Sequence, residues 1–426
     1  MPHFRKTTVS VSLVYSLTQI VNIPNANFKA RLLASNATNY IAENTIGYSI
    51  KIDTNNDGQI QVSEALQVIS LDVNTAGISN LEGISSFTNL IHLNCSQNYL
   101  TTLDVSSLTN MQNLQCAINQ LSALNVNTLT HLTDLDCSIN QITILDVSNL
   151  NQLSILHCYS NLLTSLIMGQ LTNITFLNCF DNQLTSLNVG GFTNLIYLNC
   201  FENHLTSINL TGTYNLLDLR CYGNQLTSLN VSNLVNLTYF EFSHNPLTSI
   251  DISGLISLKK IYLNDTLLTI LDASHCIHLE YLYSSYNPTL LSLYIKNSSN
   301  EVIELIENTN LQFICCDESQ LTDIQNSAST SGSTDYTVTT NCNLSTVDIY
   351  NQNDNLIFYP NPVKDYLFFK TNLSLIKVEI FDIDGRILST TVVTEKKVDL
   401  SKLKFGIYIL KIYSGNKIIT TKILKE

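Results

Sequence analysis

Six residues between positions 53 and 64 have the oxygen atoms and the spacing that a calcium ion requires: Asp53, Asn55, Asp57, Gln59, Gln61 and Glu64. The first three offer side-chain oxygens, the fourth offers its main-chain carbonyl, the fifth acts through a water molecule, and the last closes the site with both carboxylate oxygens. Gly58 permits the sharp turn, and Ile60 anchors the segment to the core. The alternative interpretation is an Asx-rich turn without a metal.

The segment Asp53–Glu64 matches the EF-hand loop pattern D-x-N-x-D-G-x-I-x-x-x-E over all of its positions. This resemblance implies a bound Ca²⁺. A single extracellular loop of this kind binds with a Kd of about 10⁻⁴ to 10⁻³ M, so we expect a structural clamp and not a sensor.

Seven cysteines recur at intervals of 21 residues: Cys95, Cys116, Cys137, Cys158, Cys179, Cys200 and Cys221. Such a column suggests a disulfide or a metal site. Stacked strands lie about 4.8 Å apart with parallel side chains, whereas a disulfide needs converging Cβ atoms about 3.5 to 4.5 Å apart. The column also continues as Phe242 and Leu263, which do not bind metals. We therefore predict buried, unpaired thiols, and the same for Cys276.

The sequence contains no motif that indicates catalysis or nucleic-acid binding. The motifs H-E-x-x-H, G-x-S-x-G, Walker A and the dinucleotide fingerprint are missing, and the eight histidines are scattered. Only 13% of the 426 residues are charged, with a formal net charge of −13, and no basic cluster marks a nucleic-acid partner. No apolar run reaches the roughly 18 residues of a transmembrane helix. We predict that the protein is not an enzyme, binds no nucleic acid and has no transmembrane segment.

The cysteines belong to a repeat that organises most of the chain. Asparagine recurs every 21 residues, with one vacancy that Thr266 fills, at positions 98, 119, 140, 161, 182, 203, 224, 245 and 287. The consensus L-x-x-L-x-C/L-x-x-N-x-L-T-x-L resembles the leucine-rich-repeat family over residues 69–316. The strand residues Leu198 and Cys200 point inward, and Asn203 hydrogen-bonds the turning backbone. We predict a mainly β solenoid of strands and turns.

Both ends of such an array require caps. Residues 19–68, with a helix at Ala26–Leu33 and the calcium loop, are expected to form a small helical N-terminal cap. Residues 317–355 are expected to form the C-terminal cap and a linker. The stretch before Asp317 resembles the closing cap of secreted bacterial leucine-rich-repeat proteins, and this resemblance implies a disulfide between Cys315 and Cys342.

Residues 356–426 have a different character, because lysines and short β-branched or aromatic runs alternate with Asn-Pro, Asp-Gly and Gly-Asn turns. This spacing predicts a small, Ig-like β-sandwich. The segments FYPNPV, VEIFDIDGRIL and LSKLKFGIYILKI resemble the type A sorting domain of the type IX secretion system. That resemblance implies the type IX machinery as a partner and a place outside a Gram-negative cell or on its outer surface. A generic Ig-like accessory domain is the alternative.

The N-terminus agrees with export. Arg5 and Lys6 precede a weakly apolar stretch from Val9 to Leu17, which is typical of a secretory signal peptide over residues 1–18. The alternatives are a wrongly assigned start codon and an ordinary chain terminus.

Aromatic residues gather at the repeat positions that the leucine-rich-repeat resemblance places on the concave side. The predicted ligand-binding residues are Tyr159, Phe180, Phe201, Tyr222, Phe176, Tyr197, Tyr239, Asp181 and Glu202. Exposed aromatic strips on rigid scaffolds commonly mark contact surfaces, but like side chains also stabilise a solenoid by stacking on one another. We predict a non-catalytic binding or adhesion protein for a protein or glycan ligand. The alternatives are a purely structural surface-coat protein and, less favoured, a secreted hydrolase.

Overall fold

The structure is a computed structural model that describes residues 18–327 and 336–342, and residues 357–425 apart from 360–362, 372–373, 383–385, 394–395, 405 and 415–416. The predicted signal peptide therefore lies outside the described residues except for Thr18. The chain divides into two compact units. Of the described residues, the first contains those up to Leu290 together with Asn297–Asn310, and the second contains Leu291–Lys296 and those from Leu311 onward.

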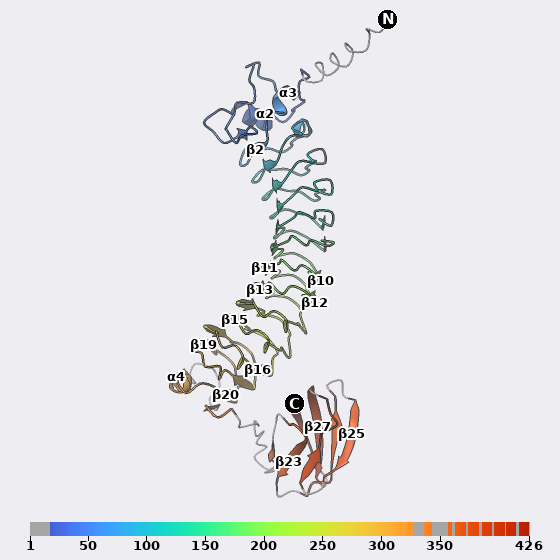
Figure 1. The fold of residues 1–426 in the computed structure, drawn as a ribbon, viewed down its shortest axis with the longest axis vertical. Coiled ribbons are helices and arrows are strands. Elements are labelled where there is room, and N and C mark those ends of the chain that lie inside the picture. Colours follow the sequence, from blue (N-terminus) through green and yellow to red (C-terminus); the bar gives the residue numbers. More distant parts are fainter. Residues whose placement is uncertain are drawn as a thin grey trace. The chain divides into compact units, whose positions relative to one another are not determined.

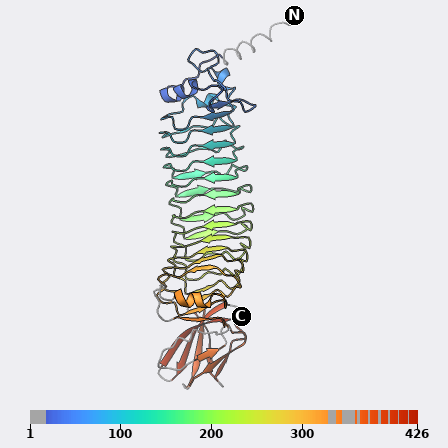
Figure 2. The ribbon, with the colours of Figure 1, turned by 90° about the vertical axis from the view of Figure 1, so that its left-hand side faces the viewer.

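The first unit is a stack of coils, each of which contributes one short strand to a continuous sheet (Figure 1). Figure 2 shows this sheet face on. After β1 (Ala42–Glu43), its strands are β2 (Ser70–Asp72), β3 (His92–Asn94), β4 (Asn113–Gln115), β5 (Asp134–Asp136), β7 (Ile155–His157), β9 (Phe176–Asn178), β11 (Tyr197–Asn199), β13 (Asp218–Arg220), β14 (Tyr239–Glu241), β15 (Lys260–Tyr262), β17 (Tyr281–Tyr283) and β19 (Val302–Glu304).

The repeat spacing sets the register of the sheet, because equivalent residues pair in parallel across neighbouring coils, as Leu198 pairs with Leu177 and Leu219. From β2 to β17 the middle residue of each strand is buried, and the two flanking residues face outward on the other side. The sheet runs along the inner side of the curved stack (Figure 1), and its outward surface is called the concave face below.

The opposite side of the coils carries a second, discontinuous set of parallel strands. They are β6 (Ile144–Asp146) paired with β8 (Ser165–Ile167), β10 (Ser186–Asn188) paired with β12 (Ser207–Asn209), and β16 (Ile270–Asp272). Residues 69–316 contain no α-helix and one short 3₁₀-helix, η1 (Ile84–Ser86). The predicted mainly β leucine-rich-repeat solenoid is therefore confirmed.

The N-terminal cap covers the first coil. Helix α2 (Ala26–Leu33) begins after Asn25, whose side chain accepts a hydrogen bond from the Phe28 N–H, and it buries Phe28 and Leu32. Strand β1 pairs antiparallel with β2 and so covers the edge of the sheet. Helix α3 (Val62–Ala65) follows the predicted calcium loop.

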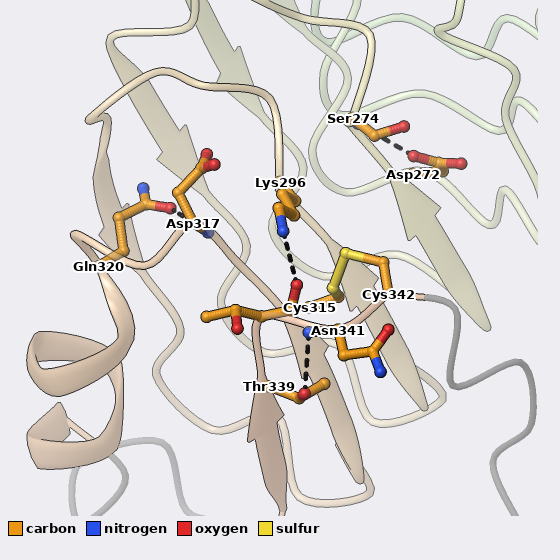
Figure 3. Close-up of a disulfide and its surroundings, with 10 residues drawn as sticks. Asp272, Ser274, Lys296, Cys315, Asp317, Gln320, Thr339, Asn341 and Cys342 are labelled. Carbon is orange, nitrogen blue, oxygen red and sulfur yellow. Dashed lines mark hydrogen bonds between the residues drawn. A yellow bond between two sulfur atoms is a disulfide. The ribbon is translucent and has the colours of Figure 1, made fainter.

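The second unit begins with strands β18 (Ser292–Tyr294), β20 (Phe313–Cys315) and β21 (Thr337–Thr339), which pair in parallel, and with helix α4 (Leu321–Ser327). Cys315 and Cys342 form a disulfide with a Cα–Cα distance of 5.4 Å (Figure 3). This is the pair that the resemblance to secreted bacterial caps implies. Nearby, the Lys296 ammonium donates a hydrogen bond to the Thr340 carbonyl.

Residues 357–425 form two antiparallel sheets around a shared apolar core. One sheet contains β22 (Ile357–Tyr359), β23 (Tyr366–Lys370) and β26 (Lys397–Asp399). The other contains β25 (Ile387–Val392), β24 (Lys377–Phe381), β27 (Gly406–Ser414) and β28 (Lys417–Lys425). Leu367, Val398, Ile380 and Leu410 are among the buried core residues from the two sheets.

Candidate binding surface

The concave face is held in shape by the repeat asparagines, which lie buried inside the coils. The Asn182 side chain donates hydrogen bonds of 3.1 Å to the carbonyls of Cys158, Cys179 and Phe180. Its side-chain oxygen accepts a bond of 2.9 Å from the Leu163 N–H. The other repeat asparagines from Asn119 to Asn245 repeat this pattern, for example Asn203. Each asparagine therefore joins its own coil to the preceding one and fixes the turn beside the concave face.

The seven column cysteines lie next to these asparagines and are free and buried, as are Cys276 and Cys316. Burial raises the pKa of the Cys95 and Cys179 thiols to about 12. No group of three or more His, Cys, Asp or Glu that could hold a metal ion occurs among the described residues. These thiols fill the core and offer no reactive thiolate.

We expect the nine free cysteines to resist alkylation in the folded protein. At pH 8 a thiol with a pKa near 12 is ionised in only about one molecule in 10⁴, and its burial also blocks the reagent. Iodoacetamide labelling followed by mass spectrometry should find the column unmodified in buffer and fully modified in guanidinium chloride. Rapid labelling of Cys158 or Cys179 without denaturant would contradict this packing.

Four aromatic residues stack face to face on successive coils of the concave face, and we call them the aromatic ladder: Tyr159, Phe180, Phe201 and Tyr222. The distances between ring centroids are 4.6, 4.3 and 4.4 Å, with interplanar angles of 8° to 16°. The inner rings, Phe180 and Phe201, have both faces covered by their neighbours. The ladder therefore presents ring edges, and not ring faces, along most of its length.

A second stack runs beside the ladder on the same face. Phe176 and Tyr197 lie with ring centroids 4.3 Å apart and an interplanar angle of 7°, and His157 lies 4.9 Å from Phe176. Asn178 and Asn199 lie on the strands between the two stacks, where their exposed fractions are 9% and 4%. The side-chain oxygen of Asn178 has no hydrogen-bond partner among the described residues.

Tyr239 is separated from the second stack by Arg220. The Arg220 guanidinium donates two hydrogen bonds of 2.9 Å to the Asp218 carboxylate. It also lies 5.5 Å from the centroid of the Tyr197 ring and 4.6 Å from that of Tyr239. The Tyr239 hydroxyl donates to Glu241, and burial raises the pKa of the Glu241 carboxyl. This surface therefore already accommodates one arginine between aromatic rings and a carboxylate.

The two predicted acidic residues lie at the turns beside the ladder. Asp181 and Glu202 have the left-handed φ values 53° and 47°, and each directly precedes a repeat asparagine. Both side chains are exposed. They flank the ladder, and we call them the acidic margin of the concave face.

The nine predicted ligand-binding residues thus lie on one face, in three groups: the ladder, the second stack and the acidic margin, with Tyr239 beyond Arg220. Arg220, Asn178 and Asn199 also belong to this surface, although they were not predicted from the sequence. For Arg220 a signal existed, because it is the first Lys or Arg after Lys51. For the two asparagines the signal was weak, because Asn is common in every coil.

The predicted calcium loop lies in the N-terminal cap, apart from the concave face. Asp53 and Glu64 are buried, each with an exposed fraction of 6%, and Ile60 is buried beneath the loop. The Asp53 carboxylate accepts hydrogen bonds of 3.2 Å from the Asp57 and Gly58 N–H groups. Gly58 has the left-handed φ of 74° that the turn requires.

The remaining loop side chains bond within the loop. The Glu64 carboxylate accepts from the Thr54 N–H and hydroxyl and from the Gln61 N–H. Asp57 accepts from the Asn55 and Gln61 amides and from the Gln59 N–H. The hydrogen bond from the Gln59 N–H is the main cause that lowers the pKa of Asp57. The residue types and the turn agree with an oxygen-ligated cation such as Ca²⁺, but Asp53, Asp57 and Glu64 do not converge into a ready-made metal cluster in this structure.

Comparison with known proteins identifies the C-terminal domain. Residues 357–426 match the secretion system C-terminal sorting domain. This match confirms the sorting domain that the tail motifs predicted. No curated protein is detectably similar in sequence to the chain. None of the described helices is long and apolar enough to cross a membrane.

Several solved structures are similar in fold. The functional domain of InlJ from Listeria monocytogenes, which includes a cysteine ladder, is 22% identical over 96% of this chain and 98% of that chain, with a TM-score of 0.47. YopM from Yersinia enterocolitica is 23% identical over 64% of this chain and 60% of that chain, with a TM-score of 0.46. An internalin, inlF, from Listeria monocytogenes is 19% identical over 70% of this chain and 96% of that chain, with a TM-score of 0.43.

Proposed function

Because residues 357–426 are a type IX secretion sorting domain, we propose that the leucine-rich-repeat solenoid is the exported cargo and works outside a Gram-negative cell or on its surface. We propose further that it is a non-catalytic binding or adhesion protein whose concave face contacts a macromolecular ligand. The observation that carries this proposal is the aromatic ladder, a rigid and partly exposed strip of four stacked rings.

Two physical arguments support binding at this face. Aromatic side chains that remain partly wet on a monomer forgo part of the free energy of burial, and a partner that covers them recovers it. The rings are also held in place before binding, since stacking and the asparagine bonds restrict them, and this lowers the entropic cost of association. The same arrangement suits an adhesin, which must present a large contact area on a stiff support.

The alternative is that the ladder only stabilises the solenoid. Each stacked pair contributes about 0.5 to 1.5 kcal/mol, which is enough to justify the column without a ligand. The unpartnered Asn178 oxygen and the acidic margin favour binding, because neither improves the stability of the coil. A catalytic role has less support, since none of the polar groups described on this face forms a nucleophile and base pair.

A matched pair of variants tests the proposal on protein and glycan arrays. The first replaces the ladder (Tyr159, Phe180, Phe201 and Tyr222) with serine. The second replaces another column on successive coils, the exposed residues Tyr214, Val235, Ile256 and Ile277, with serine. We expect ladder replacement to abolish array binding and the control replacement to leave it unchanged. Equal binding by all three proteins would assign the ladder a structural role.

We also propose that the loop Asp53–Glu64 binds one Ca²⁺ and thereby clamps the N-terminal cap to the first coil. The loop is tied to the cap by the bond from the Val21 N–H to the Ile60 carbonyl and by that from the Val62 N–H to the Gln19 carbonyl. A cation held by this loop would therefore restrain the residues on both sides of it. The chemistry that Ca²⁺ supplies is the neutralisation of the buried Asp53 and Glu64 carboxylates.

Calcium is expected to stabilise the cap measurably. With a Kd of about 10⁻⁴ to 10⁻³ M, 10 mM Ca²⁺ contributes about 1.4 to 2.7 kcal/mol by mass action. Scanning calorimetry with Ca²⁺ or with chelator should show a higher transition temperature for the cap in Ca²⁺. Asp53→Asn should remove the shift, whereas Asp104→Asn, outside the loop, should keep it. An identical transition with Ca²⁺ and with chelator would refute the calcium site.

A further inference from the structure

The charged residues of the solenoid are mostly acidic. Residues 52–219 contain twelve Asp and Glu residues and no Lys or Arg. In contrast, residues 357–426 carry 12 of the 21 Lys and Arg of the chain, which leaves 9 basic and 27 acidic residues in residues 1–356. The formal net charge of that part is −18. The part of the concave face that holds the ladder thus has acidic groups and almost no cations of its own.

Several of these acidic side chains on the concave face have no ion-pair partner among the described residues: Asp134, Asp136, Asp181 and Glu202. Asp134 is partly buried on β5, and burial raises the pKa of its carboxyl. The attraction of His157 opposes this rise and does not cancel it. Partial burial of an unpaired carboxylate raises the free energy of the folded protein, and a cation that binds beside it lowers that free energy again.

Arg220 shows how this face binds a cation. Its guanidinium donates hydrogen bonds to both carboxylate oxygens of Asp218 and lies over the Tyr239 ring. Lys260 repeats part of this arrangement, with its ammonium 4.8 Å from the centroid of the Tyr281 ring. In the coils of Tyr159, Phe180 and Phe201 the same elements, carboxylates and aromatic rings, are present without a Lys or Arg.

The ladder geometry also decides which kind of macromolecule fits. Sugars bind aromatic rings by lying on their faces, and in Phe180 and Phe201 both faces are covered by neighbouring rings. Ring edges instead offer an apolar surface for aliphatic side chains and side-chain stems.

Resting on the proposed function, we infer that the concave face from β5 to β14 binds an extended segment of a partner protein that carries arginine and lysine. The cationic groups of its arginine and lysine side chains form ion pairs with Asp134, Asp181 and Glu202. The aliphatic stems of these side chains lie on the ring edges of the ladder. Six strands about 4.8 Å apart span about 24 Å, which matches about seven residues of extended chain. Charge complementarity selects such a segment and steers its approach.

The test uses the full chain and two fluorescein-labelled peptides of equal length, repeats of Arg-Gly-Leu and of Glu-Gly-Leu, measured by fluorescence polarisation at roughly 0.15 M salt. One variant combines Asp134→Asn, Asp181→Asn and Glu202→Gln. The matched control combines Asp104→Asn, Asp146→Asn and Asp251→Asn, which lie away from the concave face and accept bonds from Ser106, Ser148 and Ser253. Asn already fills this role at positions 125, 188, 209 and 230, so the control should fold.

We expect the arginine peptide to bind the unaltered chain and the glutamate peptide not to bind. The concave triple variant should weaken arginine-peptide binding by about tenfold or more, and the control, with the same loss of charge, by less than about threefold. Equal weakening by both variants would show attraction to net charge alone and overturn the inference. Absence of arginine-peptide binding would overturn it too.

The outcomes separate this inference from the proposed function. If the ladder variant loses an array ligand that the concave triple variant still binds, the face is a binding surface but not for cations. A glycan among the ladder-dependent ligands would lead to the same conclusion. If the triple variant alone loses arginine-peptide binding and the ladder variant keeps every ligand, the acidic margin binds without the rings, and both claims about the ladder fail.

Discussion

Deletion of residues 357–426 is expected to abolish the appearance of the protein outside the cell. These residues form their own pair of antiparallel sheets with a separate apolar core, and they match a secretion-system sorting domain. Removal should leave the solenoid folded, because its repeats pack on their neighbours and not on a distant core. Immunoblots of medium, outer surface and periplasm in a host with the type IX system should find the truncated chain only inside the outer membrane.

A transfer experiment provides the control for this expectation. Residues 357–426 fused behind a signal peptide and a fluorescent protein should carry that reporter out of the same host. A fusion in which Leu367 and Ile380 of the buried core are both replaced with Asp should be retained, because the sandwich would not fold. Surface exposure of the truncated solenoid in wild-type amount would show that another segment directs export.

Replacement of Asn182 with alanine is expected to lower the free energy of unfolding by about 2 to 4 kcal/mol. The change removes donors from the carbonyls of Cys158, Cys179 and Phe180 and an acceptor from the Leu163 N–H. The three carbonyls keep other donors, namely the side chains of Asn161 and Asn203 and the Ser160 N–H. The Leu163 N–H is left unpaired inside the coil, which costs about 1 to 3 kcal/mol, and the weakened carbonyl bonds add about 1 kcal/mol. The loss should appear as a lower denaturant midpoint by circular dichroism.

Asn194→Ala is the matched control for that measurement. Asn194 is exposed and donates a single bond of 2.8 Å to the Thr172 carbonyl on the preceding coil. Water replaces this bond when the side chain is removed, so we expect a change below about 1 kcal/mol. Similar midpoints for the two variants would mean that the buried asparagines do not hold the coils together.

The repeat made the solenoid predictable from the sequence. A fixed interval of 21 residues places Leu198, Cys200 and Asn203 at the same point of every coil, and only a coil that repeats its own backbone can bury such columns. The strand runs of the tail were predictable for a similar reason, since turn residues separate them. Strand β26 has little signal in the sequence, because Lys397–Asp399 is short and has a single buried residue, Val398.

The second set of strands was harder to predict. Strands β10 and β12 carry Ser and Asn beside a single apolar residue, and the same residue types also suit turns. Their pairing arises because the main sheet has already set the coil spacing. Local sequence does not contain that information, which resides in the stacking of distant segments.

The columns of the candidate site were predictable, but its geometry was not. The sequence placed Tyr159, Phe180, Phe201 and Tyr222 on successive coils, which left open whether their rings lie flat against a ligand or against one another. The spacing of the coils is close to the distance between the centroids of two stacked rings, 4.3 Å for Phe180 and Phe201, and this favours face-to-face stacking. The insertion of Arg220 between Tyr197 and Tyr239 depends on side-chain conformations that repeat periodicity does not specify.

Ligand binding by the concave face is the central claim made for this protein. The direct measurement is a calorimetric titration of the strongest array ligand into the full chain, the ladder-to-serine variant and the control variant of Tyr214, Val235, Ile256 and Ile277. We expect the Kd to rise by about a hundredfold or more in the ladder variant and by less than about threefold in the control. Equal affinity in all three proteins, each folded by circular dichroism, would contradict the claim.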